Sequence, residues 1–137
     1  MTAPSPTRPG RLLSLWAPVG LLMAIEFGLS AQPRVPAGPF PHADKWAHAI
    51  TYAALAAAWL RALAGGRWEG VTADRALWAA VAAVAYGVTD EWHQSFVPGR
   101  SAEAIDLVAD TVGAGLAAGG LGAWGIMLRR RRAHTAR

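Results

Sequence analysis

Residues 104–128 read AIDLVADTVGAGLAAGGLGAWGIML, an almost uninterrupted apolar run that ends directly at the basic cluster Arg129–Arg132. About 20 apolar residues in a helix cross a hydrocarbon core about 30 Å thick, so this stretch predicts a transmembrane helix. It is apolar nearly all round, whereas a soluble helix carries one apolar stripe. The arginines directly follow an apolar helix, which favours an anchor among lipid headgroups over a nucleic-acid patch.

Three further apolar stretches of similar length precede this one, separated by connectors rich in proline, glycine and charge. They are approximately residues 12–31 (LLSLWAPVGLLMAIEFGLSA), 46–64 (WAHAITYAALAAAWLRALA) and 76–97 (ALWAAVAAVAYGVTDEWHQSFV). The sequence has no internal repeat and none of the alternation typical of strands. We therefore expect an all-α fold, an integral membrane bundle of four transmembrane helices that forms a single domain over residues 1–137.

The composition favours this bundle over a soluble, alanine-rich four-helix bundle. Of the 137 residues, 53% are hydrophobic and 16% are charged, which is less charge than the surface of a soluble domain usually carries. Such hydrophobicity excludes intrinsic disorder, and the absence of cysteine excludes disulfides and thiolate chemistry. The net charge of +4 would suggest nucleic acid only if the basic residues lined one folded face. They cluster beside the apolar stretches instead, so we expect no nucleic-acid partner.

The basic residues predict the orientation of the bundle, because cytoplasmic connections carry an excess of lysine and arginine. With both termini in the cytoplasm, ten of the 13 basic residues lie inside: Arg8, Arg11, Arg61, Arg67, Arg75, Arg129, Arg130, Arg131, Arg132 and Arg137. Arg34, Lys45 and Arg100 lie outside. We therefore predict a multi-pass protein of the inner (cytoplasmic) membrane with both termini cytoplasmic.

The first apolar stretch has a second interpretation. Basic residues before it and the small residues Ser30 and Ala31 at its end also fit a cleavable signal peptide. We favour its retention, and the sidedness of the other three stretches is the same in both cases.

Polar side chains collect near one end of all four stretches. They are Glu26, residues 44–52, residues 90–94 and residues 106–110, which fall at alternating ends of helices that run in opposite directions. At about 1.5 Å rise per residue, each group lies within roughly 10 Å of the outer boundary. A carboxylate in hydrocarbon costs on the order of 3 kcal/mol, so such groups normally face a bundle interior or a wet cavity. We expect a shared hydrated pocket that opens to the outside.

This outer layer and its loops hold most of the acidic residues. Seven of the nine belong to it: Glu26, Asp44, Asp90, Glu91, Glu103, Asp106 and Asp110. At low dielectric such a group of carboxylates takes up protons, charges neighbouring histidines or binds a cation. A divalent cation is therefore a candidate cofactor, with Glu91, Asp106 and Asp110 as candidate ligands. Oxygen ligands suit Mg²⁺, Ca²⁺ or Mn²⁺ better than zinc, which the histidines leave open.

Spacings of three and four residues place the remaining site candidates on shared helix faces. The catalytic candidates are His48, Glu91 and Asp106, with the histidine as proton donor or acceptor because imidazole ordinarily titrates near neutrality. The substrate-binding candidates are Lys45, Tyr52, Gln94, Arg100 and Asp110. The two cations among them would bind an anion, or alternatively anchor the chain at the membrane interface. Gly113, Gly115 and Gly119 are predicted to lie at helix contacts, with Gly115 and Gly119 at small-xxx-small spacing.

Residues 44–60 (DKWAHAITYAALAAAWL) and 86–117 (YGVTDEWHQSFVPGRSAEAIDLVADTVGAGLA) resemble the VanZ-like family of small bacterial membrane proteins. The resemblance keeps order and spacing, and it falls on Asp44, Lys45, His48, Tyr52, Gly87, Glu91, Gln94, Pro98, Gly99, Arg100, Asp106 and Gly113. Asp110 departs from the family, which more often has asparagine there. The resemblance implies a multi-helix cell-membrane protein of a family named for resistance to the glycopeptide antibiotic teicoplanin. It implies no particular reaction.

Three classes of function fit these observations. The first is a membrane protein that binds or modifies a cell-envelope lipid or its headgroup, such as a lipid-linked cell-wall precursor, with a link to antibiotic resistance. Whether it is an enzyme stays open, because the sequence holds no nucleophile motif, HExxH helix or phosphate loop. The second is a small transporter or permease, which needs polar groups through the inner halves of the stretches or a homo-oligomer that supplies the path. The third is a non-catalytic scaffold or accessory protein.

Overall fold

The computed structural model of the protein describes residues 9–33 and 40–135. Within these ranges the chain forms four long helices and one short 3₁₀ turn, and it has no strand. The elements are α1 (Pro9–Ser30), α2 (Ala43–Leu63), η1 (Trp68–Gly70), α3 (Ala73–Gln94) and α4 (Ala104–Thr135). The predicted all-α fold with four helices is therefore confirmed. Arg8, Arg34 and Arg137, which entered the predicted orientation, lie outside the described residues.

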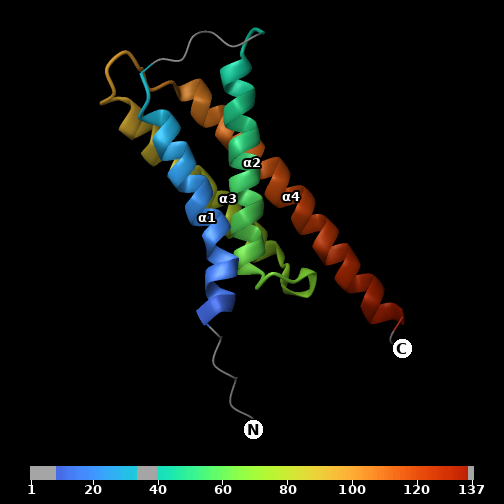
Figure 1. Cartoon of the computed structure of the whole chain (residues 1–137). Coiled ribbons are helices and arrows are strands. Elements are labelled where there is room, and N and C mark those ends of the chain that lie inside the picture. Colours follow the sequence, from blue (N-terminus) through green and yellow to red (C-terminus); the bar gives the residue numbers. More distant parts are fainter. Residues whose placement is uncertain (1–8, 34–39, 136–137) are drawn as a thin grey trace.

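The four helices run alternately up and down the bundle (Figure 1). α4 packs along α2 and α3, and α1 lies mainly against α2. The start of α1 and the end of α4 lie at the same end of the molecule (Figure 1). We call the end where α1 and α3 finish and α2 and α4 begin the polar end, and the opposite one the basic end. This arrangement brings the four predicted groups of polar residues to one end.

The last helix extends further than the apolar run that predicts it. α4 has 32 residues and continues through the basic cluster to Thr135. Arginine is a good helix former, so nothing in the cluster ends the helix. Near its end the guanidinium of Arg132 pairs with the carboxylate of Glu69 in η1.

Alanine and glycine form much of the interior, and they let the helix backbones approach closely. Ala56, Ala79, Ala83 and Ala114 are fully buried. A Cβ atom on Gly113 of α4 would lie 2.0 Å from the carbonyl oxygen of Ala49 in α2, so only glycine fits there.

The predicted contact role of Gly115 and Gly119 is wrong within the chain, because both face open space with no atom within 4 Å. The predicted contact of Gly113 is confirmed, and Gly122 and Gly125 make two more, with Ala76 of α3 and with Val71 in the segment between η1 and α3. Cβ atoms built on them would lie 2.8 Å from Ala76 and 2.7 Å from Val71. The spacing rule identified a small-residue helix but not the face that meets its neighbours.

The outer surface of the bundle is apolar over all four helices. Large exposed side chains include Leu21 and Phe27 on α1, Ile50 on α2, Trp78 on α3 and Leu116 on α4. By length and composition, α1 and α4 could cross a membrane. α2 and α3, with 21 and 22 residues, have the length but not the apolar composition. Their hydropathy is lowered by polar residues that the bundle interior buries or half-buries, such as His48, Asp90 and Glu91.

Candidate functional site

A cavity of about 840 Å³ opens at the polar end. Its wall combines ionisable and polar side chains from all four helices and from the segment before α4: Glu26, Asp44, Lys45, His48, Thr51, Gln94, Arg100, Ser101, Glu103 and Asp106. The structure thus brings together Lys45, His48, Gln94, Arg100 and Asp106 at one opening, as their helical depth predicts. Tyr52, Glu91 and Asp110 lie beside this wall and are buried.

His48 is held by a buried carboxylate. Its Nδ1 atom lies 2.9 Å from Oδ1 of Asp110, a residue of α4 with 0% exposure. A Cβ atom on Gly87 of α3 would lie 2.8 Å from Oδ2 of Asp110, so glycine makes the room for this carboxylate. The ring of Tyr52 stacks parallel to the imidazole at a centroid distance of 6.3 Å. These contacts fix the imidazole, and its Nε2 atom lies 4.0 Å from Oδ1 of Asp106.

Lys45 neutralises the acidic group around it. Its Nζ atom lies 2.6 Å from Asp106, 2.7 Å from Glu103 and 3.0 Å from Asp44. Burial alone would lower the pKa of this ammonium, but the three carboxylates outweigh burial and hold the pKa above its ordinary value. The hydrogen bond from the ammonium in turn lowers the pKa of Asp44. Lys45 is therefore already engaged by carboxylates at the mouth of the cavity.

Arg100 is the cation in the cavity wall that has no carboxylate partner among the described residues. The turn before it, where Gly99 has a φ of 81°, closes with a 3.0 Å hydrogen bond from the Arg100 amide to the carbonyl of Val97. Its Nε atom is buried and has no hydrogen-bond partner within the described part of the chain. Of the two predicted anion-binding cations, the structure leaves Arg100 available.

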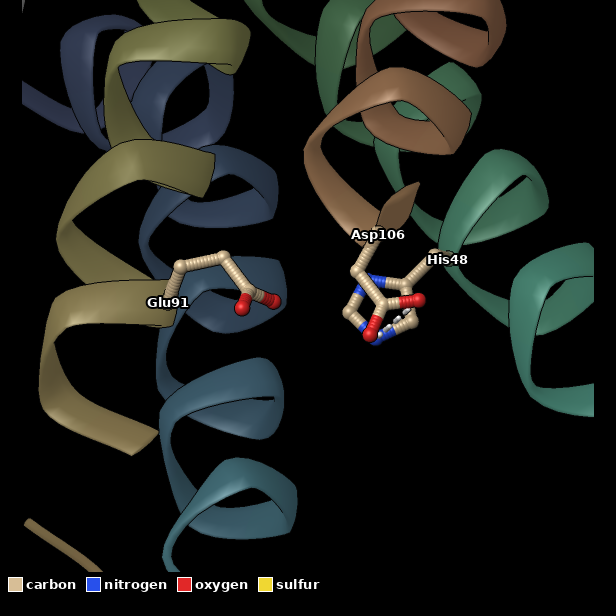
Figure 2. A group of neighbouring side chains, drawn as sticks. All are labelled: His48, Glu91 and Asp106. Atoms are coloured by element: carbon tan, nitrogen blue, oxygen red, sulfur yellow. Dashed lines mark ion pairs between the residues drawn. The ribbon is translucent and has the colours of Figure 1, made fainter. Parts of the chain in front are cut away.

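Glu91 reaches inward from α3. Its Oε2 atom accepts a 2.8 Å hydrogen bond from the backbone amide of Glu103, which ties α3 to the segment that starts α4. Its Oε1 atom is buried and has no hydrogen-bond partner in the described ranges. Figure 2 shows Glu91 extending toward His48 and Asp106 on the other side of the site, and ligand atoms of these three residues lie within 4.8 Å of one another.

Two further acidic residues of the predicted outer layer belong to the site, although neither was among the predicted catalytic or binding residues. Asp90 is 3% exposed, and its Oδ2 atom accepts a 2.9 Å hydrogen bond from the Gln94 amide. The bond therefore uses one of the two N–H groups of the Gln94 side chain, which was predicted to bind substrate. Glu26 is buried on α1 and lines the cavity. Their depth in the polar layer was the signal, and the spacing of four between Asp90 and Gln94 was the clue to their pairing.

The fold and the site define a class: a small bundle of externally apolar helices that has, at one end, a buried group of carboxylates, a histidine and an arginine without a carboxylate partner in the described part of the chain. The chain belongs to the VanZ/LLP1 family, whose model matches residues 11–126. That range contains every residue of the site described above, and the predicted family is confirmed. The chain matches no curated protein. It matches no solved structure either.

Proposed function

We propose that the protein is a multi-pass protein of the cell membrane whose polar end faces outward and binds the anionic headgroup of a cell-envelope lipid. One observation carries this proposal: the open cavity of about 840 Å³ has Arg100 in its wall, without a carboxylate partner among the described residues, on a bundle whose sides are apolar. A lipid whose chains lie along the helices would place its phosphate at this opening. Arginine suits phosphate because its planar group donates two parallel hydrogen bonds.

The apolar sides support a membrane location. A soluble monomer rarely exposes contiguous apolar patches larger than a few hundred Å², whereas exposed leucine, isoleucine, phenylalanine and tryptophan side chains occur on all four long helices here. The described basic residues support the orientation, since Arg11, Arg61, Arg67, Arg75 and Arg129–Arg132 lie at the basic end. This distribution matches a cytoplasmic basic end.

Native mass spectrometry of the full chain in mild detergent tests lipid binding. We expect an anionic lipid to stay bound, to be lost in Arg100→Gln and to be largely kept in Arg100→Lys, which preserves the charge. Arg130→Gln is the matched control, because this exposed arginine lies at the opposite end. Equal retention by Arg100→Gln and the control would contradict the proposal.

Cysteine labelling tests the orientation, because the chain has no cysteine of its own. Ser101→Cys at the polar end and Ala133→Cys at the basic end both replace exposed residues. A membrane-impermeant maleimide added to intact cells should label only Ser101→Cys, and lysis should expose Ala133→Cys. The reverse pattern would place the cavity in the cytoplasm.

A second candidate is modification of the bound lipid, favoured by the fixed imidazole of His48. With Nδ1 held by Asp110, Nε2 is the atom directed toward Asp106 and the cavity. His48, Glu91 and Asp106 are then the residues for proton transfer. Purified protein should release phosphate from a lipid panel or alter a lipid-linked cell-wall precursor, and His48→Gln should abolish this turnover. Absence of turnover across the panel would leave binding as the function.

A scaffold and a transporter make different predictions. If the polar group only holds the helices together, Arg100→Gln should lower membrane abundance; if it binds a ligand, teicoplanin susceptibility should rise at normal abundance. A transporter in a single chain needs polar groups along its length. In the half of the bundle toward the basic end, the buried described side chains include Leu15, Leu60, Val71 and Ala76, which disfavours a continuous polar path.

A further inference from the structure

We propose that His48, Glu91 and Asp106 bind one divalent transition-metal ion of the zinc or manganese type, with Asp110 as the positioning residue that orients the histidine. The three side chains come from α2, α3 and α4, and Glu91 extends toward His48 and Asp106 (Figure 2). Their ligand atoms lie within 4.8 Å of one another. Two ligands on opposite sides of such an ion are at most about 4.2 Å apart, so the side chains would move closer together when the ion binds.

The unsatisfied carboxylate oxygen is an independent sign of a ligand. Glu91 is 8% exposed, and its Oε1 atom is buried without a hydrogen-bond partner in the described residues while its Oε2 atom is held by the Glu103 amide. A buried polar atom normally has a partner. The carboxylate is directed toward His48 and Asp106 (Figure 2), so a cation between them is the partner that fits.

The hydrogen bond on the far side of the imidazole favours a metal-binding role. Histidines that bind metals almost always donate their other ring N–H to a carboxylate, a carbonyl or water. Oδ1 of the fully buried Asp110 lies 2.9 Å from Nδ1 of His48. In the neutral imidazole whose Nδ1–H is donated to an ionised Asp110, the Nε2 lone pair is the one left for a metal ion on the side of Asp106.

This arrangement changes the ligand set from the sequence-based expectation. Asp110 is engaged with His48, and the imidazole takes its place beside Glu91 and Asp106. One nitrogen and two oxygen ligands suit zinc or manganese, whereas Mg²⁺ and Ca²⁺ prefer oxygen alone. The charge balance also favours a cation, because the single positive charge of Lys45 offsets only part of the negative charge of the carboxylates at this end.

The ion would be reached from the cavity, since His48 and Asp106 both line its wall. Three protein ligands leave a coordination position open for an oxygen from outside. Arg100 lies in the same wall. A phosphate oxygen would then contact the ion while Arg100 binds another oxygen of the same group, a step that rests on the proposed function.

Metal binding is measured on the full chain in detergent after EDTA treatment and dialysis, by calorimetric titration with Zn²⁺, Mn²⁺ and Mg²⁺ and by elemental analysis. We expect one Zn²⁺ or Mn²⁺ per chain and far weaker Mg²⁺ binding. Glu91→Gln and Asp106→Asn should weaken binding at least 100-fold, and Asp110→Asn should weaken it by about 10- to 100-fold. Asp44→Asn is the matched control, because this carboxylate lies at the same end and is 64% exposed.

X-ray absorption of the zinc-loaded wild-type protein adds a readout that needs no variant, and it should show scattering from one imidazole. The inference is overturned if wild-type protein binds no transition metal, if Glu91→Gln binds it as wild type does, or if the imidazole signal is missing. Lipid retention is followed with and without chelator in parallel. If the protein retains lipid but binds no metal, only the metal site is contradicted. If it binds metal but retains no lipid, only the proposed function is contradicted.

Discussion

Replacing Gly113 by alanine should separate α2 from α4 and disturb the site, because this contact lies within one helical turn of Asp110 and beside His48. The new Cβ atom would lie 2.0 Å from the Ala49 carbonyl oxygen, and carbon and oxygen normally stay about 3.3 Å apart. The helices must therefore move apart by about 1.3 Å at this point. The obstacle is backbone, so no rotamer change relieves it.

The expected loss of stability is about 1–3 kcal/mol, the usual range for overpacking a tight interior. The same movement should lengthen the 2.9 Å contact between His48 and Asp110, because Ala49 adjoins the histidine and Asp110 lies one turn from Gly113 on α4. Thermal unfolding in detergent measures the first effect. Titration with Zn²⁺ measures the second, as a weaker affinity.

Gly115→Ala is the matched control, two residues along the same helix. Gly115 has nothing within 4 Å, and alanine is a better helix former than glycine by up to about 1 kcal/mol. The control should therefore unfold at the same or a higher temperature. If the Gly113 and Gly115 variants behave alike, the close approach of α2 and α4 is not what the structure describes, and the reasoning fails.

Four further substitutions and measurements probe other contacts. Gly87→Ala should displace the Asp110 carboxylate, whose Oδ2 atom would lie 2.8 Å from the new Cβ, and lower the unfolding temperature; unchanged unfolding would show that the carboxylate has room. Lys45→Met should cost about 3 kcal/mol, because it leaves the buried Asp106 carboxylate without the ammonium that lies 2.6 Å from it; an unchanged temperature of thermal unfolding would show that Lys45 does not compensate this carboxylate. Tyr86→Phe removes the 2.6 Å hydrogen bond to the Met23 carbonyl that links α3 to α1, and it should lower the free energy of unfolding by about 1 kcal/mol. If the intact mass of the purified protein shows that α1 has been cleaved off, the substitution should have no effect on stability. Glu69→Gln should leave the unfolding temperature unchanged, because its ion pair with Arg132 is exposed, and a large drop would mean that this pair is structurally important.

The sequence predicted how far along each helix the polar residues lie. It predicted only in part which face of each helix meets its neighbours. Hydropathy predicted four helices, and their alternating direction brought Glu26, His48, Glu91 and Asp106 to one end, as the structure shows. The same patterns could not decide between Gly113 and Gly115, because the facing side of a helix depends on how its neighbours pack. The hydropathy run also ended α4 at residue 128, although arginines prolong the helix.

Pairing between helices was beyond the sequence. Lys45 was expected to bind an anion, yet three carboxylates from its own helix and from the start of α4 surround it. Asp110 was expected among the cation ligands, yet it holds the Nδ1 side of His48. Residues far apart in the sequence choose partners by the geometry of three helices at once, which no spacing rule within one helix contains.

The length of α4 connects the two ends of the molecule mechanically. At about 1.5 Å per residue its 32 residues form a rod of about 48 Å, longer than the hydrocarbon thickness of about 30 Å. If α4 crosses a membrane as proposed, Arg129–Arg132 extend beyond the hydrocarbon on the same helix that carries Asp106 and Asp110. Because both groups belong to one continuous helix, a rotation of α4 about its axis at the basic end would also change the direction of Asp106 and Asp110 at the polar end.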